Sequence, residues 1–200
     1  MHLLIMGPPG AGKGTQASRI GARSGVPAIS TGDMFRAMRD LDTPLARQVR
    51  GIMASGGYVS DDITNQVVTS RLAEPDCAPG FLLDGYPRTL QQVEYLDAIL
   101  DEGGRAVDAV LSLEADSDEV VRRLLKRAET SGRDDDNEAT IRTRQDKYTV
   151  ETAPLLDVYR QRGLLVEVDG LGAVDDVTRR LFAALDERAG SGSALVGGAS

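Results

Sequence analysis

Short apolar runs alternate with amphipathic stretches along most of the chain. The runs are rich in Leu, Ile or Val and fall at residues 3–6, 26–29, 81–83, 109–113 and 164–168. Between and after them, apolar residues recur every three to four positions, as at Leu90, Val93, Leu96 and Leu100 and again at Val174, Val177, Leu181 and Leu185. That period is typical of a helix with one buried face. Buried strands separated by helices indicate an α/β fold with a five-stranded parallel sheet covered on both faces. We expect the apolar helical positions to lie in the core.

Two stretches depart from this alternation of predicted strands and helices. Residues 30–59 predict short helices with a break at Gly56-Gly57, and residues 126–138 are polar and dense in charge. We expect both to be excursions over the carboxyl ends of the strands, where open α/β sheets bind ligands. Residues 1–29, 60–125 and 139–188 would then form the core domain. Residues 189–200 have no periodic apolar face, which predicts a flexible tail without a functional role.

A glycine-rich segment follows the first apolar run directly. Residues 7–16 read Gly-Pro-Pro-Gly-Ala-Gly-Lys-Gly-Thr-Gln, and a helical pattern follows from Gln16. Glycines let several backbone N–H groups approach a polyphosphate, and the start of a helix favours the same anion. Lys13 adds a mobile charge and Thr15 offers a hydroxyl to Mg²⁺. The alternative is a turn without a ligand, but a strand before and a helix after favour a phosphate-binding loop.

Asp84 ends the third apolar run. A carboxylate at the tip of a strand beside a phosphate-binding loop is placed to hold Mg²⁺ through water, because Mg²⁺ loses its waters reluctantly. An aspartate at this position can also cap a helix or form a turn. The neighbouring Gly85 and Arg88 favour the metal-binding interpretation.

Composition narrows the function classes. The chain has 200 residues, 41% of them hydrophobic and 27% charged, and a net charge of −8. An acidic chain is not expected to bind nucleic acid polymers, which need many basic contacts. We find no apolar stretch long enough to span a membrane and no leader, so we expect a cytoplasmic protein with no membrane partner. A single cysteine, Cys77, excludes a four-cysteine zinc site, and the single histidine, His2, makes histidine catalysis unexpected.

Four motifs in order resemble the adenylate kinase family, over roughly residues 1 to 187. They are residues 7–16, Thr31-Gly-Asp-Met-Phe-Arg36, Asp84-Gly-Tyr-Pro-Arg-Thr89 with Gln92, and Arg123 to Arg127 followed by Ser-Gly-Arg-Asp-Asp at 131–135. The resemblance implies a P-loop three-layer fold with strand order 2-3-1-4-5. It also implies Mg²⁺-dependent, reversible transfer of the terminal phosphate of ATP to AMP, giving two ADP, in adenine nucleotide homeostasis. Residues 126–138 correspond to a short lid and residues 30–59 to an AMP-binding segment.

The resemblance also implies a role for each matching residue. The ATP site would comprise Gly10, Ala11, Gly12, Lys13, Gly14, Thr15, Arg127 and Gly172. The AMP site would comprise Thr31, Arg36, Gly57, Tyr58, Val59, Gly85, Tyr86, Pro87, Arg88, Gln92, Arg133 and Arg144. The catalytic groups would be Lys13, Arg88, Arg123, Arg127, Arg133 and Arg144, with Thr15 and Asp84 at Mg²⁺ and no zinc. The expected partners are ATP and AMP (or ADP) alone, bound by a monomer.

Two rival functions fit much of the same sequence. A UMP/CMP kinase would share the fold and the arginines, but Thr31 and Gln92 favour an adenine acceptor. A catalytically silent nucleotide-binding module would have lost a catalytic group, and every expected group is present. A turnover assay separates these functions.

Overall fold

The computed structural model describes residues 1–38, 41–131 and 137–194, and only the backbone at residues 117–118, 127–131 and 191–194. Five strands form one parallel sheet in the order β2-β3-β1-β4-β5, as predicted. Their bounds are β1 His2–Met6, β2 Ala28–Ser30, β3 Phe81–Asp84, β4 Ala109–Glu114 and β5 Leu165–Asp169. β1 is central, and its Leu4 aligns with Leu83 on one side and Val110 on the other.

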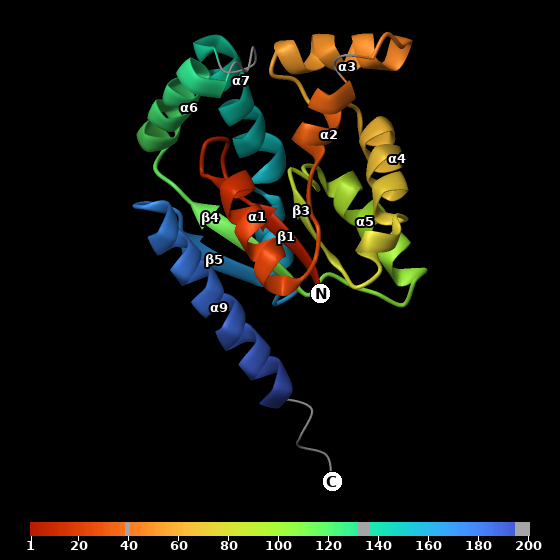
Figure 1. Cartoon of the computed structure of the whole chain (residues 1–200), viewed down its shortest axis with the longest axis vertical. Helices are drawn as coiled ribbons and strands as arrows, with labels where there is room; N and C mark the ends of the chain where they lie inside the picture. Colours follow the sequence, from red (N-terminus) through yellow and green to blue (C-terminus); the bar gives the residue numbers. More distant parts are fainter. Residues whose placement is uncertain (39–40, 132–136, 195–200) are drawn as a thin grey trace.

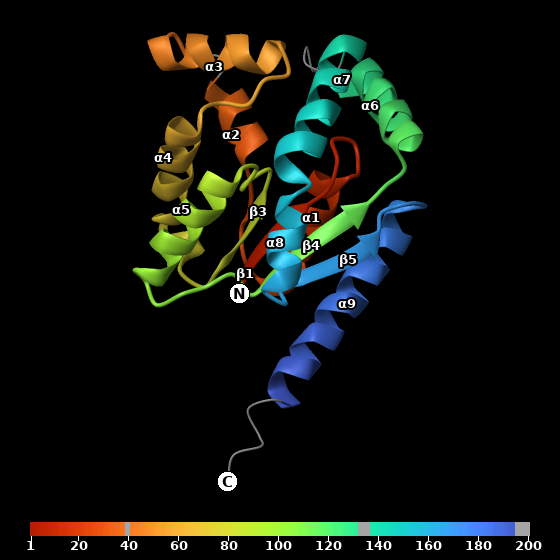
Figure 2. The same ribbon diagram turned by 180° about the vertical axis from the view of Figure 1, so that it is seen from behind.

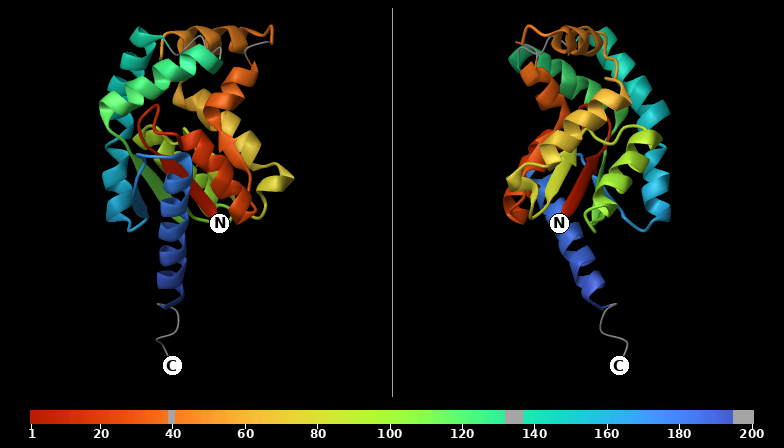
Figure 3. Two further views of the ribbon diagram at one scale, coloured as in Figure 1. Left: turned by 60° about the vertical axis from the view of Figure 1, so that its left-hand side comes forward. Right: turned by 90° about the vertical axis from the view of Figure 1, so that its right-hand side faces the viewer.

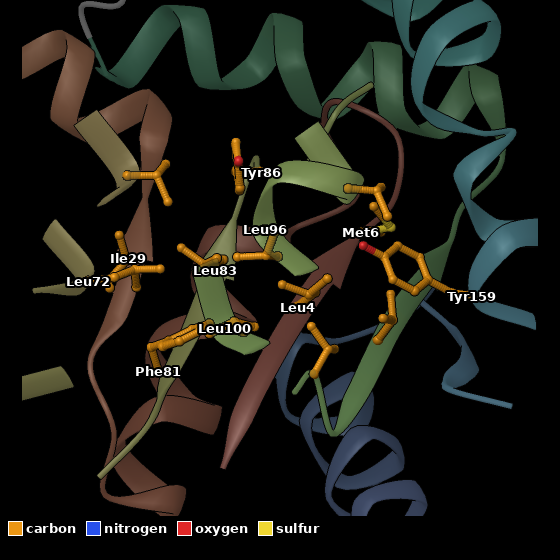
Figure 4. Close-up of a cluster of buried hydrophobic side chains, with 14 of the residues drawn as sticks. Leu4, Met6, Ile29, Leu72, Phe81, Leu83, Tyr86, Leu96, Leu100 and Tyr159 are labelled. Atoms are coloured by element: carbon orange, nitrogen blue, oxygen red, sulfur yellow. The ribbon is translucent and has the colours of Figure 1, made fainter. Parts of the chain in front are cut away.

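Helices cover both faces of the sheet, and alternate residues of β1 pack against them. Leu3 and Ile5 belong to the apolar cluster that α1 (Lys13–Ser24) and α9 (Val174–Ala194) complete. Leu4 and Met6 belong to the cluster on the opposite face, with α4 (Asp61–Leu72), α5 (Leu90–Asp101) and α8 (Leu155–Gln161). Figures 1 and 2 show the two layers, and Figure 4 shows Leu4 and Met6 beside Tyr159. Because successive side chains of a strand point to opposite faces, both faces of the sheet are apolar and helices cover both, which gives a three-layer fold.

Two helical excursions lie beyond the carboxyl ends of the strands (Figures 1 and 3). The first contains α2 (Thr31–Ala37) and α3 (Pro44–Ala54), with a small core of its own built from Phe35, Val49 and Val59. The second contains α6 (Ser117–Ser131) and α7 (Glu138–Lys147), and a π-helical turn (Tyr148–Thr152) leads from α7 towards α8. The two excursions touch, because the hydroxyl of Thr140 donates to the carbonyl of Ala54 at 3.2 Å. A short 3₁₀ helix, Pro75–Cys77, precedes β3.

Two apolar positions predicted to lie in the core are exposed instead. Leu90 is 52% exposed and Val174 is 46% exposed, whereas the rest of each stripe is buried. Both are the first residues of their helices. Helical side chains lean towards the N-terminus, so a first-turn residue reaches past the surface that its helix covers.

Helix bounds also differ from the pattern. α1 begins at Lys13 rather than Gln16, because the left-handed Gly12 ends the loop and starts the helix. α6 continues to Ser131, so residues 126–131 of the predicted excursion are helical. α9 reaches Ala194 and therefore includes residues 189–194 of the predicted tail. Within the described ranges, no helix combines the length and apolar character needed to cross a membrane.

Candidate active site

A cleft of about 580 Å³ lies at the carboxyl end of the sheet. Its walls carry most of the loop at 7–15, Asp84, Gly172 and the arginines 36, 88, 123 and 144. A second pocket of about 60 Å³ adjoins it and is lined by Thr31, Gly57, Val59 and Gln92 among others. The two share Gly32, Arg36, Tyr58, Gly85, Arg88 and Arg144. Three arginines therefore stand where the two pockets meet.

The loop after β1 packs closely against the end of β4. Gly7 has φ +138°, and a Cβ there would lie 2.6 Å from the carbonyl oxygen of Leu113, so only glycine fits. Lys13 folds back over the loop, and its Nζ donates to the carbonyls of Gly7 at 2.7 Å and Pro8 at 2.9 Å. Every loop residue predicted to bind ATP lines the cleft, from Gly10 to Thr15. Backbone and ammonium donors are thus gathered on one wall.

Asp84 brings a carboxylate to this wall. It is the last residue of β3 and is only 9% exposed. Burial raises the pKa of Asp84, and the nearby charges of Lys13 and Arg88 oppose that shift. A Cβ on Gly14 would stand 3.5 Å from its Oδ2, so the carboxylate faces the loop. Carboxylate and hydroxyl oxygens suit Mg²⁺, so Asp84 and Thr15, which both line the cleft, fit the predicted metal site.

Arg88 is held from several sides. Its Nε donates to the carbonyl of Gly85 at 2.7 Å, and its guanidinium carbon lies 4.6 Å from the centre of the Tyr58 ring. The Nζ of Lys147 lies 5.3 Å from the same ring. The hydroxyl of Thr152 donates to the carbonyl of Arg88 at 3.0 Å, and the Tyr58 hydroxyl lies 3.3 Å from the Thr152 hydroxyl. These contacts orient a cation towards the junction of the two pockets.

The other described arginines of the cleft are also held by neighbours. Arg36 pairs with Asp33 at 2.5 Å, and Arg123 pairs with Glu119 at 2.8 Å. Arg123 also donates to the carbonyl of Gly170 at 3.2 Å. Arg144 lines both pockets. The side chains of two predicted site residues have no described position, since Arg127 is described only by its backbone in α6 and Arg133 falls outside the described residues.

The polar side chains of the small pocket are held by hydrogen bonds to neighbouring groups. Gln92 is only 2% exposed, and its Oε1 accepts from the backbone N–H of Arg88 at 2.8 Å. Its Nε2 donates to Asp61 at 2.6 Å. The hydroxyl of Thr31 donates to the carbonyl of Gly85 at 2.9 Å. Thr31 and Gln92, which lie far apart in the sequence, therefore share one pocket, as the motifs predicted.

Tyr86 and Pro87 support this pocket from the core side. They are joined by a cis peptide bond and line the large cleft. The Tyr86 hydroxyl donates to Asn65 at 2.7 Å, and burial raises the pKa of Tyr86, so the hydroxyl stays protonated at neutral pH. The segment between β3 and α5 is thereby fixed to α4.

Three acidic residues beside the site were not predicted from the sequence. Asp33 and Glu119 pair with arginines three and four residues later, and that helical spacing is a signal that could have found them. Asp61 contacts Gln92 across 31 positions of sequence, and no local pattern announces such a pair.

Comparisons with known proteins agree with this geometry. A family model described as adenylate kinase matches residues 5–164. A protein named adenylate kinase from Leifsonia xyli subsp. xyli is 60% identical over 186 residues, covering 93% of this chain and 94% of its own. One of the same name from Clavibacter michiganensis subsp. michiganensis is 57% identical, with 94% of each chain covered. A third, from a Nocardioides species, is 55% identical, with 93% of this chain and 97% of its own covered.

Proposed function

The chain belongs to the adenylate kinase family and is a phosphotransferase, and on that premise we propose how its cleft moves the terminal phosphate of ATP to AMP. ATP lies along the loop at residues 7–15, and AMP lies with its base at the small pocket and its phosphate at the junction with the cleft. The observation that carries this proposal is the junction of the two pockets, which Arg36, Arg88 and Arg144 share. A phosphate of each nucleotide would meet there.

Phosphoryl transfer demands positioning and charge more than covalent help from the protein. Lys13 and the backbone N–H groups of the loop hold the ATP phosphates, with Arg127 and the backbone at Gly172 on the ATP side. Arg36 and Arg88 hold the phosphate of AMP. Arg123, Arg133 and Arg144 contribute charge to the transferring group. Arginine suits this work because its planar fork matches phosphate oxygens and stays charged in any environment.

Mg²⁺ accompanies ATP in this family. Asp84 and Thr15 would hold it, Asp84 through water, and the ion would neutralise charge on the phosphates. The raised pKa of Asp84 marks a carboxylate that burial makes costly to ionise, which suits a position that a cation compensates.

The acceptor base lies against Thr31 and Gln92. Both side chains are buried in the small pocket, and the chain from Gly57 to Val59 forms another of its walls. The segment Gly85-Tyr86-Pro87 supports Arg88 and Thr31, whose side chains both donate to the carbonyl of Gly85. An amide and a hydroxyl in a confined pocket read a base by hydrogen bonds. The resemblance of Thr31 and Gln92 to the adenylate kinase motifs favours adenine over a pyrimidine.

We assign residues 30–59 to an AMP-binding segment, 126–138 to a short lid, 1–29, 60–125 and 139–188 to the core, and 189–200 to a tail that begins within the last turns of α9. Thr140 lies in α7 two residues after the assigned lid, and its contact with Ala54 supports an arrangement in which the chain at the end of the lid and the AMP-binding segment meet and shield the cleft from water. We place the enzyme in the cytoplasm as a monomer that uses only small-molecule partners.

The test is ADP production from ATP and Mg²⁺ with AMP, CMP, UMP or GMP in parallel. We expect rapid ADP formation with AMP and little with the other acceptors. A preference for CMP or UMP would contradict the assignment of Thr31 and Gln92. ATP binding without turnover would instead identify a silent nucleotide-binding module.

A further inference from the structure

Asp61 connects two helices at the edge of the small pocket. It is the first residue of α4, and its carboxylate contacts two side chains at the start of α5. Oδ1 accepts from Nε2 of Gln92 at 2.6 Å, and Oδ2 accepts from the hydroxyl of Thr89 at 2.7 Å. Asp61 and Thr89 are half-buried and Gln92 is buried. Both carboxylate oxygens are therefore engaged beside the pocket.

The amide of Gln92 stands between an obligate acceptor and an obligate donor. A carboxylate only accepts hydrogen bonds, so Nε2 must face Asp61. A backbone N–H only donates, so Oε1 must face Arg88, and that bond measures 2.8 Å. Turning the amide over would set oxygen against oxygen and N–H against N–H. The orientation of Gln92 follows from the chemistry of its two neighbours.

This orientation leaves a defined pair of groups for a ligand. An amide has two N–H donors and two acceptor lone pairs, and each neighbour uses one. One donor and one lone pair remain in fixed order on a side chain that lines the small pocket. Thr31 uses its only hydroxyl proton on Gly85, so it offers acceptor capacity alone.

Whether a purine can pair with this donor and acceptor of Gln92 depends on the group at position 6 of the base. Adenine presents an amino donor beside a ring-nitrogen acceptor, which an amide can pair at both points. A 6-oxo purine presents an acceptor where adenine has its donor. If the amide cannot turn, the 6-oxo group faces the lone pair of Gln92, and a polar group is left unpaired, which is costly in a confined site.

We propose that Asp61 is a positioning residue that fixes the side-chain amide of Gln92 and so selects a 6-amino over a 6-oxo purine as acceptor. The proposal rests on the proposed function, because it assumes that the acceptor base occupies the small pocket. It adds a specificity role for a residue that touches neither phosphate.

A simpler role for Asp61 is stabilisation of α4 by a negative charge at its first turn. Asp62 follows it in the same turn and is exposed. Asp62→Asn makes the same change of charge beside the same helix end without touching Gln92. It is therefore the matched control for Asp61→Asn.

The experiment compares AMP with inosine monophosphate, a 6-oxo purine nucleotide of similar size, as acceptor for ATP and Mg²⁺. The readout is the ratio of kcat/KM for AMP to kcat/KM for inosine monophosphate. An asparagine at position 61 can donate as well as accept, so it removes one of the two constraints on the amide and leaves only the backbone N–H of Arg88 to orient Gln92. We expect Asp61→Asn to lower the ratio by about tenfold, the scale of one charged hydrogen bond, and Asp62→Asn to leave it unchanged. In a Gln92→Ala background, Asp61→Asn should change the ratio by less than about twofold, because no amide remains to be oriented.

Three results would overturn the proposal. They are an unchanged ratio in Asp61→Asn, an equal fall in both aspartate variants, and the same fall in the Gln92→Ala background. A purely structural role for Asp61 would lower kcat/KM for both nucleotides alike. The measurement on the wild-type enzyme tests the proposed function separately. A wild-type enzyme without preference for AMP over inosine monophosphate would contradict the proposed function before any variant is compared.

A measurement on the unaltered protein covers the case in which Asp61→Asn does not fold. The side-chain amide resonances of Gln92 in the wild-type protein should show one proton protected from exchange with water and shifted by its bond to the carboxylate. Two averaged, rapidly exchanging amide protons would overturn the proposal without any variant.

Discussion

The two halves of the cleft are built on different principles. The half assigned to ATP is mainly backbone, a glycine-rich loop that packs against β4 and leads into α1. The half assigned to AMP is mainly side chains that neighbouring groups hold in place, as Asp33 holds Arg36 and Asp61 holds Gln92. A backbone site binds any polyphosphate of the right shape, whereas a side-chain site discriminates among bases. The difference teaches that affinity for a shared group and selectivity for one acceptor can be assigned to separate parts of a fold.

The largest effects should come from removing a cation on each side of the junction. Lys13→Ala and Arg88→Ala should each lower kcat by at least about a hundredfold, in line with loss of one preorganised charge. If the halves are distinct, Lys13→Ala also raises KM for ATP, and Arg88→Ala also raises KM for AMP. Steady-state kinetics with each nucleotide varied in turn measures this.

Arg179→Ala is the control for these variants, because Arg179 is an exposed residue of α9 that forms a surface ion pair with Asp176. It should turn over like the wild type. Turnover at the wild-type rate in Lys13→Ala or Arg88→Ala would contradict the assignment of that residue.

Asp84→Asn should separate activity from stability. We expect activity to fall about 10- to 100-fold, the usual cost of losing a group that holds a metal ion through water. The ligand-free protein should become more resistant to denaturant at pH 7, because burial raises the pKa of Asp84 in the folded state and makes its ionised form costly. Wild-type activity would remove Asp84 from the metal site.

The pH dependence of that stability gain has a definite sign. Above the raised folded-state pKa, the wild type bears the whole cost of the buried charge, so the advantage of the Asp84→Asn variant is complete. Below the ordinary carboxyl pKa of about 4, Asp84 is neutral in both folded and unfolded states and the advantage disappears. Denaturant unfolding of both proteins between pH 4 and pH 8 measures this, and a gain that grows on acidification would contradict it.

Gln92→Ala should affect the acceptor half alone. We expect weaker AMP binding by about 1–2 kcal/mol, the usual contribution of hydrogen bonds to a buried polar partner, with KM for ATP unchanged. Titration of each nucleotide by calorimetry measures both affinities. Equal losses for ATP and AMP would show that the two halves are not independent.

The smallest effect should come from the ring that supports Arg88. Tyr58→Leu removes the contact between ring and guanidinium and should raise KM for AMP by about twofold to tenfold, the range of a cation–π interaction. Tyr58→Phe keeps the ring and loses only the hydroxyl that faces Thr152, so it should behave like the wild type. If the Tyr58→Phe and Tyr58→Leu variants lose affinity equally, the hydroxyl and not the ring supports the site.

The sequence predicted the backbone half better than the side-chain half, and the reason is physical. Residues 7–15 are contiguous, and three of their glycines, Gly7, Gly10 and Gly12, have positive φ angles that favour glycine, so the loop can be identified from the local sequence. The sheet order followed from the family resemblance and is confirmed. Contacts such as Asp61 with Gln92 arise only when α4 packs beside α5, and no local pattern encodes that packing. Leu90 failed as a core residue because periodicity does not show where the surface beneath a helix ends.

The carbonyl of Gly85 accepts from both Thr31 and Arg88. A group assigned to the acceptor base and one assigned to its phosphate are thus anchored on one peptide unit, whose glycine leaves no room for a Cβ. The span between the two anchors is then a fixed length, and the pocket works as a ruler for the nucleotide between them. On the proposed assignment a nucleoside is too short to reach both anchors, a monophosphate reaches both, and the phosphate that it gains would extend towards the loop at residues 7–15.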